Sequence, residues 1–193
     1  MPTTTDTPSA SLNELIRTRW SPRQYLDRAI APDDLKTLFE AARWASSCYN
    51  EQPWRFIVAT KDDPEHFAKV LGLLMEMNRK WAAGAAVLGF SAGKKTFTHN
   101  GAPNRFGIHD VGAGSASLAI EAAARGLHAH FMGGFDAARA RTEFAVPEDF
   151  EIGAAFAIGY IDEAAVKPGD RTRKPLSDLV FGKNWGESAE FCR

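Results

Sequence analysis

The chain has 193 residues, a formal charge of −1 and an apolar content of 45%, values that are typical of one globular domain and argue against a fibrous or disordered protein. The near-neutral charge gives no overall attraction to nucleic acid or to anionic lipid. The two cysteines, Cys48 and Cys192, have neither a CxxC partner nor zinc-ligand spacing, so no disulfide framework and no structural metal are expected.

The N-terminal residues 1–10 are rich in Thr, Ser and Pro and have neither a basic region nor an apolar core. We interpret them as a flexible lead-in rather than a signal peptide. No apolar run reaches the roughly 20 residues that a membrane-spanning helix needs. We therefore expect a cytoplasmic protein, with a single domain over residues 11–193.

Two helices are predicted before the first strand. A short amphipathic helix follows Ser11, a plausible N-cap, and ends before Ser21-Pro22, because the residue before a proline disfavours the helical region. Pro32 opens the second helix, with acidic residues near its N-terminus. Its apolar stripe consists of Leu35, Leu38, Phe39 and Ala42.

The later part of the chain alternates strand and helix patterns. In chain order we expect a strand over 55–60, a helix over 66–80, an interior strand over 85–90, a mobile surface loop over 91–107, a helix over 108–125, a short strand at 130–132, a helix over 137–144 and a strand over 151–160.

Three details refine this pattern. Small residues dominate the helix over 108–125, which suits close packing either as a central core helix or at a symmetric dimer interface. Gly126 is expected just beyond its C-terminus. After the Gly133-Gly134 turn, Asp136 is placed to cap the next helix.

The loop from Ser46 to Phe56 is the most informative segment of the sequence. Hydroxyls, a thiol and carboxamides gather there, where an amphipathic helix passes into a buried strand, and loops of this kind usually hold ligands. Two basic clusters, 17–23 and 171–174, suit the two-sided binding of one phosphate. Each cluster taken alone is also consistent with solvated surface charge.

Other common site motifs are absent from the sequence. It contains no GxxxxGK[ST] loop, no dinucleotide fingerprint and no GxSxG elbow. The histidines lack the spacing of standard zinc motifs, so packing or surface roles are expected for them. They are His99, His109, His128 and His130.

Four motifs in their order along the chain suggest a family. Arg19-Trp20-Ser21-Pro22-Arg23, the stretch from Ser46 to Trp54, Gly133-Gly134-Phe135-Asp136 and Arg171-Thr172-Arg173 together resemble the FMN-dependent nitroreductase family. The resemblance covers roughly residues 12–179. It implies an α+β, nitroreductase-like three-layer fold, with a mixed, mainly antiparallel sheet flanked by helices, in an intertwined homodimer whose C-terminal extension lies over the partner subunit.

The resemblance also implies a function. The implied protein is an NAD(P)H-dependent FMN oxidoreductase that passes electrons to a small nitroaromatic, quinone, enal or enone by a ping-pong mechanism. A non-catalytic protein that stores or senses FMN is the alternative. Because the flavin carries the chemistry, no catalytic side chain is expected.

By the same resemblance, FMN would be held by residues from both subunits. In one chain these are Arg19, Trp20, Ser21, Arg23, Lys80, Phe131, Met132, Gly133, Gly134, Arg171 and Arg173; in the partner they are Ser46, Ser47, Cys48, Asn50 and Gln52. Arg19, Ser21, Arg171 and Arg173 would bind the phosphate, and Arg23 would lie near the pyrimidine edge of the ring. Lys80 has an equally plausible role on a solvated helix face. Two departures, Ser46 in place of proline and Gly133 in place of an acid, leave the substrate class open.

Overall fold

The computed structural model describes residues 12–162, 164 and 173–192. The chain divides into two compact units, Thr18–Glu163 on the one hand and Met1–Arg17 with Ala164–Arg193 on the other. The predicted lead-in, 1–10, lies outside the described residues. Each unit is described below by itself.

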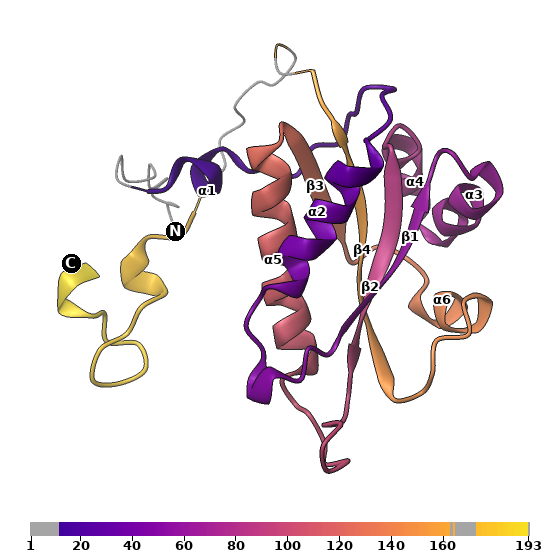
Figure 1. The fold of residues 1–193 in the computed structure, drawn as a ribbon. Coiled ribbons are helices and arrows are strands. Elements are labelled where there is room, and N and C mark those ends of the chain that lie inside the picture. Colours follow the sequence, from indigo (N-terminus) through magenta and orange to yellow (C-terminus); the bar gives the residue numbers. More distant parts are fainter. Residues whose placement is uncertain (1–11, 163, 165–172, 193) are drawn as a thin grey trace. The chain divides into compact units, whose positions relative to one another are not determined.

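The larger unit is built on a four-stranded sheet in the order β1-β2-β4-β3 (Figure 1). Its strands are β1 (Trp54–Thr60), β2 (Val87–Lys94), β3 (Leu127–Met132) and β4 (Phe150–Tyr160). All three neighbouring pairs are antiparallel. This arrangement leaves β1 and β3 as the two edges of the sheet.

Helices cover both faces of this sheet and produce three layers (Figure 1). One face carries α2 (Pro32–Arg43) and α5 (Gly107–Ala124), and the other carries α3 (Pro64–Leu73), α4 (Glu76–Ala82) and α6 (Ala137–Glu143). A separate apolar cluster fills the space on each face. The predicted α+β class with helices flanking an antiparallel sheet is confirmed. None of the helices in the described part of the chain is long and apolar enough to cross a membrane.

The small residues of α5 allow it to pack closely against α2. A Cβ atom added at Gly114 would come within 3.2 Å of the Ala42 carbonyl oxygen and 3.7 Å of the Trp54 ring. Gly126, with φ of 68°, follows the helix at the predicted position, a conformation that glycine adopts without steric cost. The core role predicted for this helix is confirmed, and a dimer interface stays a prediction.

The helix predicted over 66–80 is in fact two helices. Between α3 and α4, the Met75 N–H donates to the Gly134 carbonyl at 3.0 Å, and the Asp136 N–H donates to the Leu73 carbonyl at 2.8 Å. Leu74 also forms an isolated β-bridge with Phe135. These long-range backbone bonds replace the local ones that would continue the helix.

The loop predicted over 91–107 begins later than expected, because β2 continues to Lys94. Ser91 is only 1% exposed. Its hydroxyl donates to the Ala154 carbonyl at 3.2 Å and accepts from the Ala154 N–H at 3.1 Å, where the strand register shifts between Phe90 and Ala92. A polar residue therefore lies inside the sheet because its side chain completes the hydrogen bonding of an irregular ladder.

The smaller unit contains short elements. Among its described residues they include α1 (Glu14–Thr18), which ends at the first residue of the larger unit, and the 3-10 turns η3 (Leu176–Asp178) and η4 (Glu190–Cys192). Between the two turns, the Ala189 N–H donates to the Val180 carbonyl at 3.0 Å. The unit exposes large apolar side chains, including Trp185 at 92% and Phe191 at 84%.

Candidate functional site

The segment over 19–25 lies along β3 and is fixed to it by two contacts. The Trp20 ring meets the His128 ring edge-on, with centroids 6.0 Å apart. The buried Pro22 accepts a hydrogen bond at its carbonyl oxygen from Nδ1 of His130, at 2.7 Å. The predicted site residues that this arrangement leaves exposed are Ser21 and Arg23.

Helix α4 joins the same assembly through an aromatic stack. The Trp81 ring stacks on His130 with centroids 4.5 Å apart, and on Tyr25 at 6.3 Å. Lys80, next to Trp81, is exposed and pairs with Glu76 at 2.8 Å. The larger unit thus brings the 19–25 segment, β3 and the helix that carries Lys80 together.

His130 is the half-buried centre of this assembly. Burial lowers its pKa below the ordinary 6.5, and the positive charge of Arg23 lowers it further, while the Pro22 carbonyl acts in the opposite direction. A carbonyl can only accept, so Nδ1 carries the proton and Nε2 is left as an acceptor in the neutral ring. The ring is therefore held in one tautomer beside Arg23.

The glycine turn after β3 presents open backbone. The Gly134 carbonyl accepts from the Asn78 side chain at 3.0 Å, and a Cβ atom at Gly134 would lie 2.6 Å from that nitrogen. At Gly133, which is exposed, a Cβ atom would meet nothing within 4 Å. The turn is fixed on one side and accessible on the other, which suits close approach of a flat ligand to the backbone.

The two predicted residues before the turn differ in exposure. Phe131 is half-buried, with its ring 6.1 Å from that of Phe156. Met132 is 4% exposed and belongs to the apolar cluster on the face of the sheet opposite to that of Phe131. Only the backbone of Met132 is therefore placed to approach a ligand.

The predicted ligand loop follows α2 and contains the short turn η1 (Cys48–Asn50). Tyr49, Asn50 and Gln52 have φ values of 52°, 54° and 52°, in the left-handed region that costs about 1–3 kcal/mol for each non-glycine residue. Ser46, just before the turn, is exposed. Residues held in this region cluster at ligand-binding sites because strain persists only where the surroundings enforce it.

Hydrogen bonds from side chains help to enforce this loop conformation. The Ser47 hydroxyl accepts from the Gln52 N–H at 3.0 Å, and the Gln52 side chain donates to the Asn50 carbonyl at 3.2 Å. Asp110, in the first turn of α5 and only 4% exposed, accepts from the Cys48 N–H at 2.9 Å. A buried carboxylate from a separate helix thus fixes the position of the loop.

Glu51 attaches the loop to the segment after β2. Its carboxylate accepts from the Thr98 N–H at 2.9 and 3.0 Å and from the Thr98 hydroxyl, and it lies 3.9 Å from the Lys94 ammonium. The Thr98 hydroxyl bond, with Lys94 contributing, lowers the pKa of Glu51. Only 6% of the Glu51 side chain is exposed. This ionised acid therefore joins two loops at the surface.

The ligand loop and the glycine turn lie at opposite edges of the sheet. The loop leads into β1 and the turn follows β3, with β2 and β4 between them (Figure 1). Three strand spacings correspond to about 14 Å. The fold therefore separates the two predicted halves of the site within one chain.

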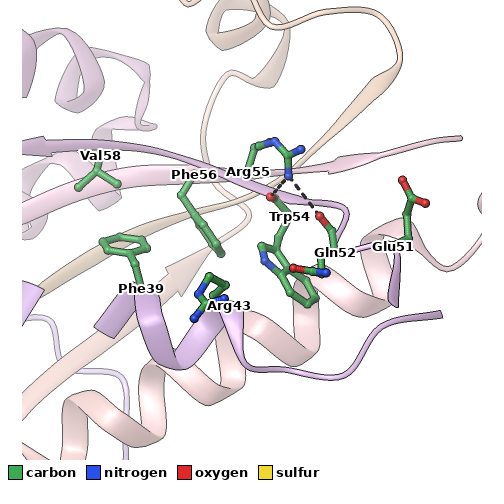
Figure 2. A pocket seen from close by; sticks show the side chains of 8 residues that line it. All are labelled: Phe39, Arg43, Glu51, Gln52, Trp54, Arg55, Phe56 and Val58. Atoms are coloured by element: carbon green, nitrogen blue, oxygen red, sulfur yellow. Dashed lines mark hydrogen bonds between the residues drawn. The ribbon is translucent and has the colours of Figure 1, made fainter. Parts of the chain in front are cut away.

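A groove of about 610 Å³ lies next to the ligand loop, over β1 and α2. Figure 2 shows Phe39, Phe56 and Val58 along the groove, while the Arg55 guanidinium turns back to donate to the Gln52 and Trp54 carbonyls at 3.2 and 2.7 Å. The remaining lining residues are Arg43 and Glu51.

Comparison with known proteins decides the family. The model of the nitroreductase family matches residues 16–160, well over half of the chain. The chain belongs to the nitroreductase family. The resemblance inferred from its motifs is confirmed.

Related structures and sequences agree with this membership. A crystal structure titled as that of "the oxidoreductase containing FMN" shares 34% identity, covering 97% of this nitroreductase-family chain and 100% of its own, with a TM-score of 0.86. A protein of Desulfovibrio desulfuricans, solved in complex with FMN, shares 26% identity over 93% and 99% of the two chains, with a TM-score of 0.73. A Stenotrophomonas maltophilia protein named "Putative NADH dehydrogenase/NAD(P)H nitroreductase" is 28% identical over 83% of this chain and 90% of its own.

The predicted phosphate-binding residues fall in different parts of this nitroreductase-family chain. Arg19 is half-buried at the start of the larger unit, and Arg173 is exposed in the smaller one. Arg171 lies outside the described residues. The assignment of all these residues to FMN stays a proposal.

Sequence reasoning missed three residues that organise the candidate site. The sequence predicts only a packing or surface role for His130, and it assigns no role to Asp110 or Glu51. An acid in the first turn of a helix is an ordinary favourable feature, and an acid in a polar loop carries no signal of its own. Their importance follows from long-range contacts that the sequence does not display.

Proposed function

We propose that this nitroreductase-family protein is an FMN-dependent oxidoreductase that passes electrons from NAD(P)H to a small organic acceptor by a ping-pong mechanism. The main support for the proposal is the similarity, over nearly the whole chain, to a solved structure described as an oxidoreductase containing FMN. The name of the Stenotrophomonas relative supports the pyridine nucleotide as donor. That donor is consistent with the expected cytoplasmic location.

The residues along β3 fit the phosphate and the pyrimidine edge of FMN. In this proposal Arg19 and Ser21 bind the phosphate with Arg171 and Arg173, since a guanidinium pairs with phosphate oxygens through two parallel hydrogen bonds. The exposed Arg23, next to His130, contributes a positive charge near the pyrimidine edge. The remaining residues proposed on this side are Trp20 and Lys80.

The glycine turn fits the ring itself. The open space at Gly133 lets a planar ring approach the backbone, and the fixed Gly134 holds the turn in place. Phe131 and the backbone of Met132 lie beside it. Bound FMN would supply hydride-transfer chemistry, while the residues of the chain bind and orient the ring and leave one face accessible to each substrate in turn.

We assign the ligand loop to the flavin of a second copy of the chain. Ser46, Ser47, Cys48, Asn50 and Gln52 would approach the ring from the partner, with Asn50 offering both a donor and an acceptor. The separation of β1 from β3 supports this assignment, because one chain does not bring its own loop to its glycine turn. The exposed Trp185 and Phe191 support a homodimer in which the C-terminal segment covers the partner, since large exposed apolar side chains often mark interaction surfaces.

Anaerobic spectroscopy of the purified holoprotein tests the proposal. We expect a yellow protein whose visible flavin band bleaches on addition of NADH or NADPH and returns on addition of menadione or nitrofurazone. A flavin band that neither nucleotide bleaches would favour the alternative, an FMN storage or sensor protein. A protein that stays colourless after FMN is added would contradict both.

A further inference from the structure

Three aromatic side chains form a cluster, with Tyr49 in the ligand loop and Phe97 and His99 in the segment after β2. The Tyr49 ring lies 5.7 Å from the Phe97 ring and 6.0 Å from the His99 ring, and Phe97 and His99 are 5.5 Å apart. Tyr49 is 82% exposed. His99 is also exposed and Phe97 is half-buried. Aromatic rings normally bury most of their surface, so the exposed rings of Tyr49 and His99 are available for contact with a ligand.

Hydrogen bonds between the two loops hold the cluster in place. Tyr49 and Asn50 are both in the left-handed region, and Glu51 follows them with its carboxylate on Thr98, the residue between Phe97 and His99. Lys94 donates to the Thr98 hydroxyl at 2.7 Å and completes the junction. Because Glu51 joins the two loops, the three rings keep a common arrangement.

The cluster adjoins residues that are proposed to contact the flavin of the partner. Tyr49 lies between Cys48 and Asn50, two residues assigned to the flavin under the proposed function, on which this step rests. Rings adjoining those residues therefore lie at the border of the flavin site. A planar aromatic acceptor placed there gains offset or edge-to-face stacking, whereas an aliphatic acceptor does not.

We propose that Tyr49, Phe97 and His99 form a wall that selects planar aromatic electron acceptors by ring contact, and that Glu51 is the positioning residue that holds this wall. For a quinone, NAD(P)H loses a hydride and becomes NAD(P)⁺, and the quinone gains that hydride's two electrons and proton together with one solvent proton. The wall takes part by binding, not by proton transfer.

Equilibrium binding of menadione to the oxidised holoprotein, measured by calorimetry without turnover, tests the wall. Tyr49→Leu, Phe97→Leu and His99→Leu each place an aliphatic side chain where a ring stood, and we expect each to weaken menadione binding about 2- to 10-fold. Trp44→Leu, at an exposed ring outside the cluster, should bind as the parent does. Reoxidation of the dithionite-reduced protein by ferricyanide, which has no ring to stack, should stay unchanged in all four variants.

The outcomes separate this inference from the proposed function. Parental menadione binding in Tyr49→Leu and Phe97→Leu would overturn the wall while leaving the flavoenzyme intact. Equal losses with menadione and ferricyanide would also overturn it. A parent protein that binds no FMN would instead refute the proposed function.

Glu51 is tested through Thr98. Glu51→Gln and Thr98→Val should weaken menadione binding without changing the limiting rate of reoxidation, and Thr98→Ser, which keeps the hydroxyl, should behave as the parent. Trypsin should also cleave the Glu51→Gln protein faster after Lys95, because the loop is released. Unchanged menadione binding and unchanged cleavage in Glu51→Gln would overturn its positioning role.

Discussion

His130 connects the 19–25 segment, β3 and α4, so its protonation affects three parts of the candidate site. Its pKa is lowered in the folded protein, mainly by burial. The unfolded chain therefore binds a proton more readily than the folded one as the pH falls below the ordinary value of 6.5. The contribution of the neutral ring to stability is fully present above that value and is lost as the pH falls through the lower, folded pKa.

Replacing His130 should flatten the pH dependence of stability. In His130→Asn the side-chain amide can still donate to the Pro22 carbonyl but does not titrate, so the free energy of unfolding should fall less between pH 7.5 and pH 5, values that bracket the His range, than in the parent. In His130→Gln the slope should be equally flat, with about 1 kcal/mol less stability at the upper pH from the lost hydrogen bond. Urea denaturation at both pH values measures this, and a parental slope in His130→Asn would contradict the role assigned to burial.

The elements show which features the sequence could predict. Helix α2 begins at Pro32 and buries Leu38 and Ala42 from the predicted stripe, and Asp136 caps α6 by accepting from the Arg139 N–H at 2.9 Å. These features depend on residues within one or two turns of each other. Local chemistry is therefore enough to predict them.

The errors arose where distant contacts override local pattern. Nothing near Leu74 marks the end of a helix, because the backbone bonds that end it come from Gly134 and Asp136. The strand is predicted to end before Ser91, because the partner that keeps Ser91 in the sheet, Ala154, is distant in sequence. For the same reason the motifs predict the segments of the candidate site but not the residues that hold those segments in place.

Packing around Gly89 in β2 provides a test at the scale of the sheet. A Cβ atom there would lie 2.2 Å from the Ile57 carbonyl oxygen and 2.3 Å from the Phe156 ring. Gly89→Ala should therefore cost about 1–3 kcal/mol through overpacking. In α3, Gly72→Ala meets only an ordinary contact at 3.6 Å and should gain about 0.5–1 kcal/mol from helix propensity. Thermal unfolding of both variants checks the pair, and equal melting temperatures would contradict this description of the core.

Under the proposed function, the flavin site is divided between two copies of the chain. The predicted flavin contacts lie at opposite edges of one sheet and in both compact units. We propose that these contacts form two half-sites in each chain and that a second copy of the chain completes each of them. The resemblance of the motifs predicted the family and the fold, whereas the pairing of the halves depends on an association that one chain does not contain.

Sedimentation velocity, followed at the visible absorbance of the flavin during dilution, tests whether a second copy of the chain completes the flavin site. If Asn50 and its neighbours complete the site of the partner, the flavin signal should travel with the dimer alone, and the monomer formed on dilution should be colourless. Flavin that sediments with the monomer would contradict the two-chain site.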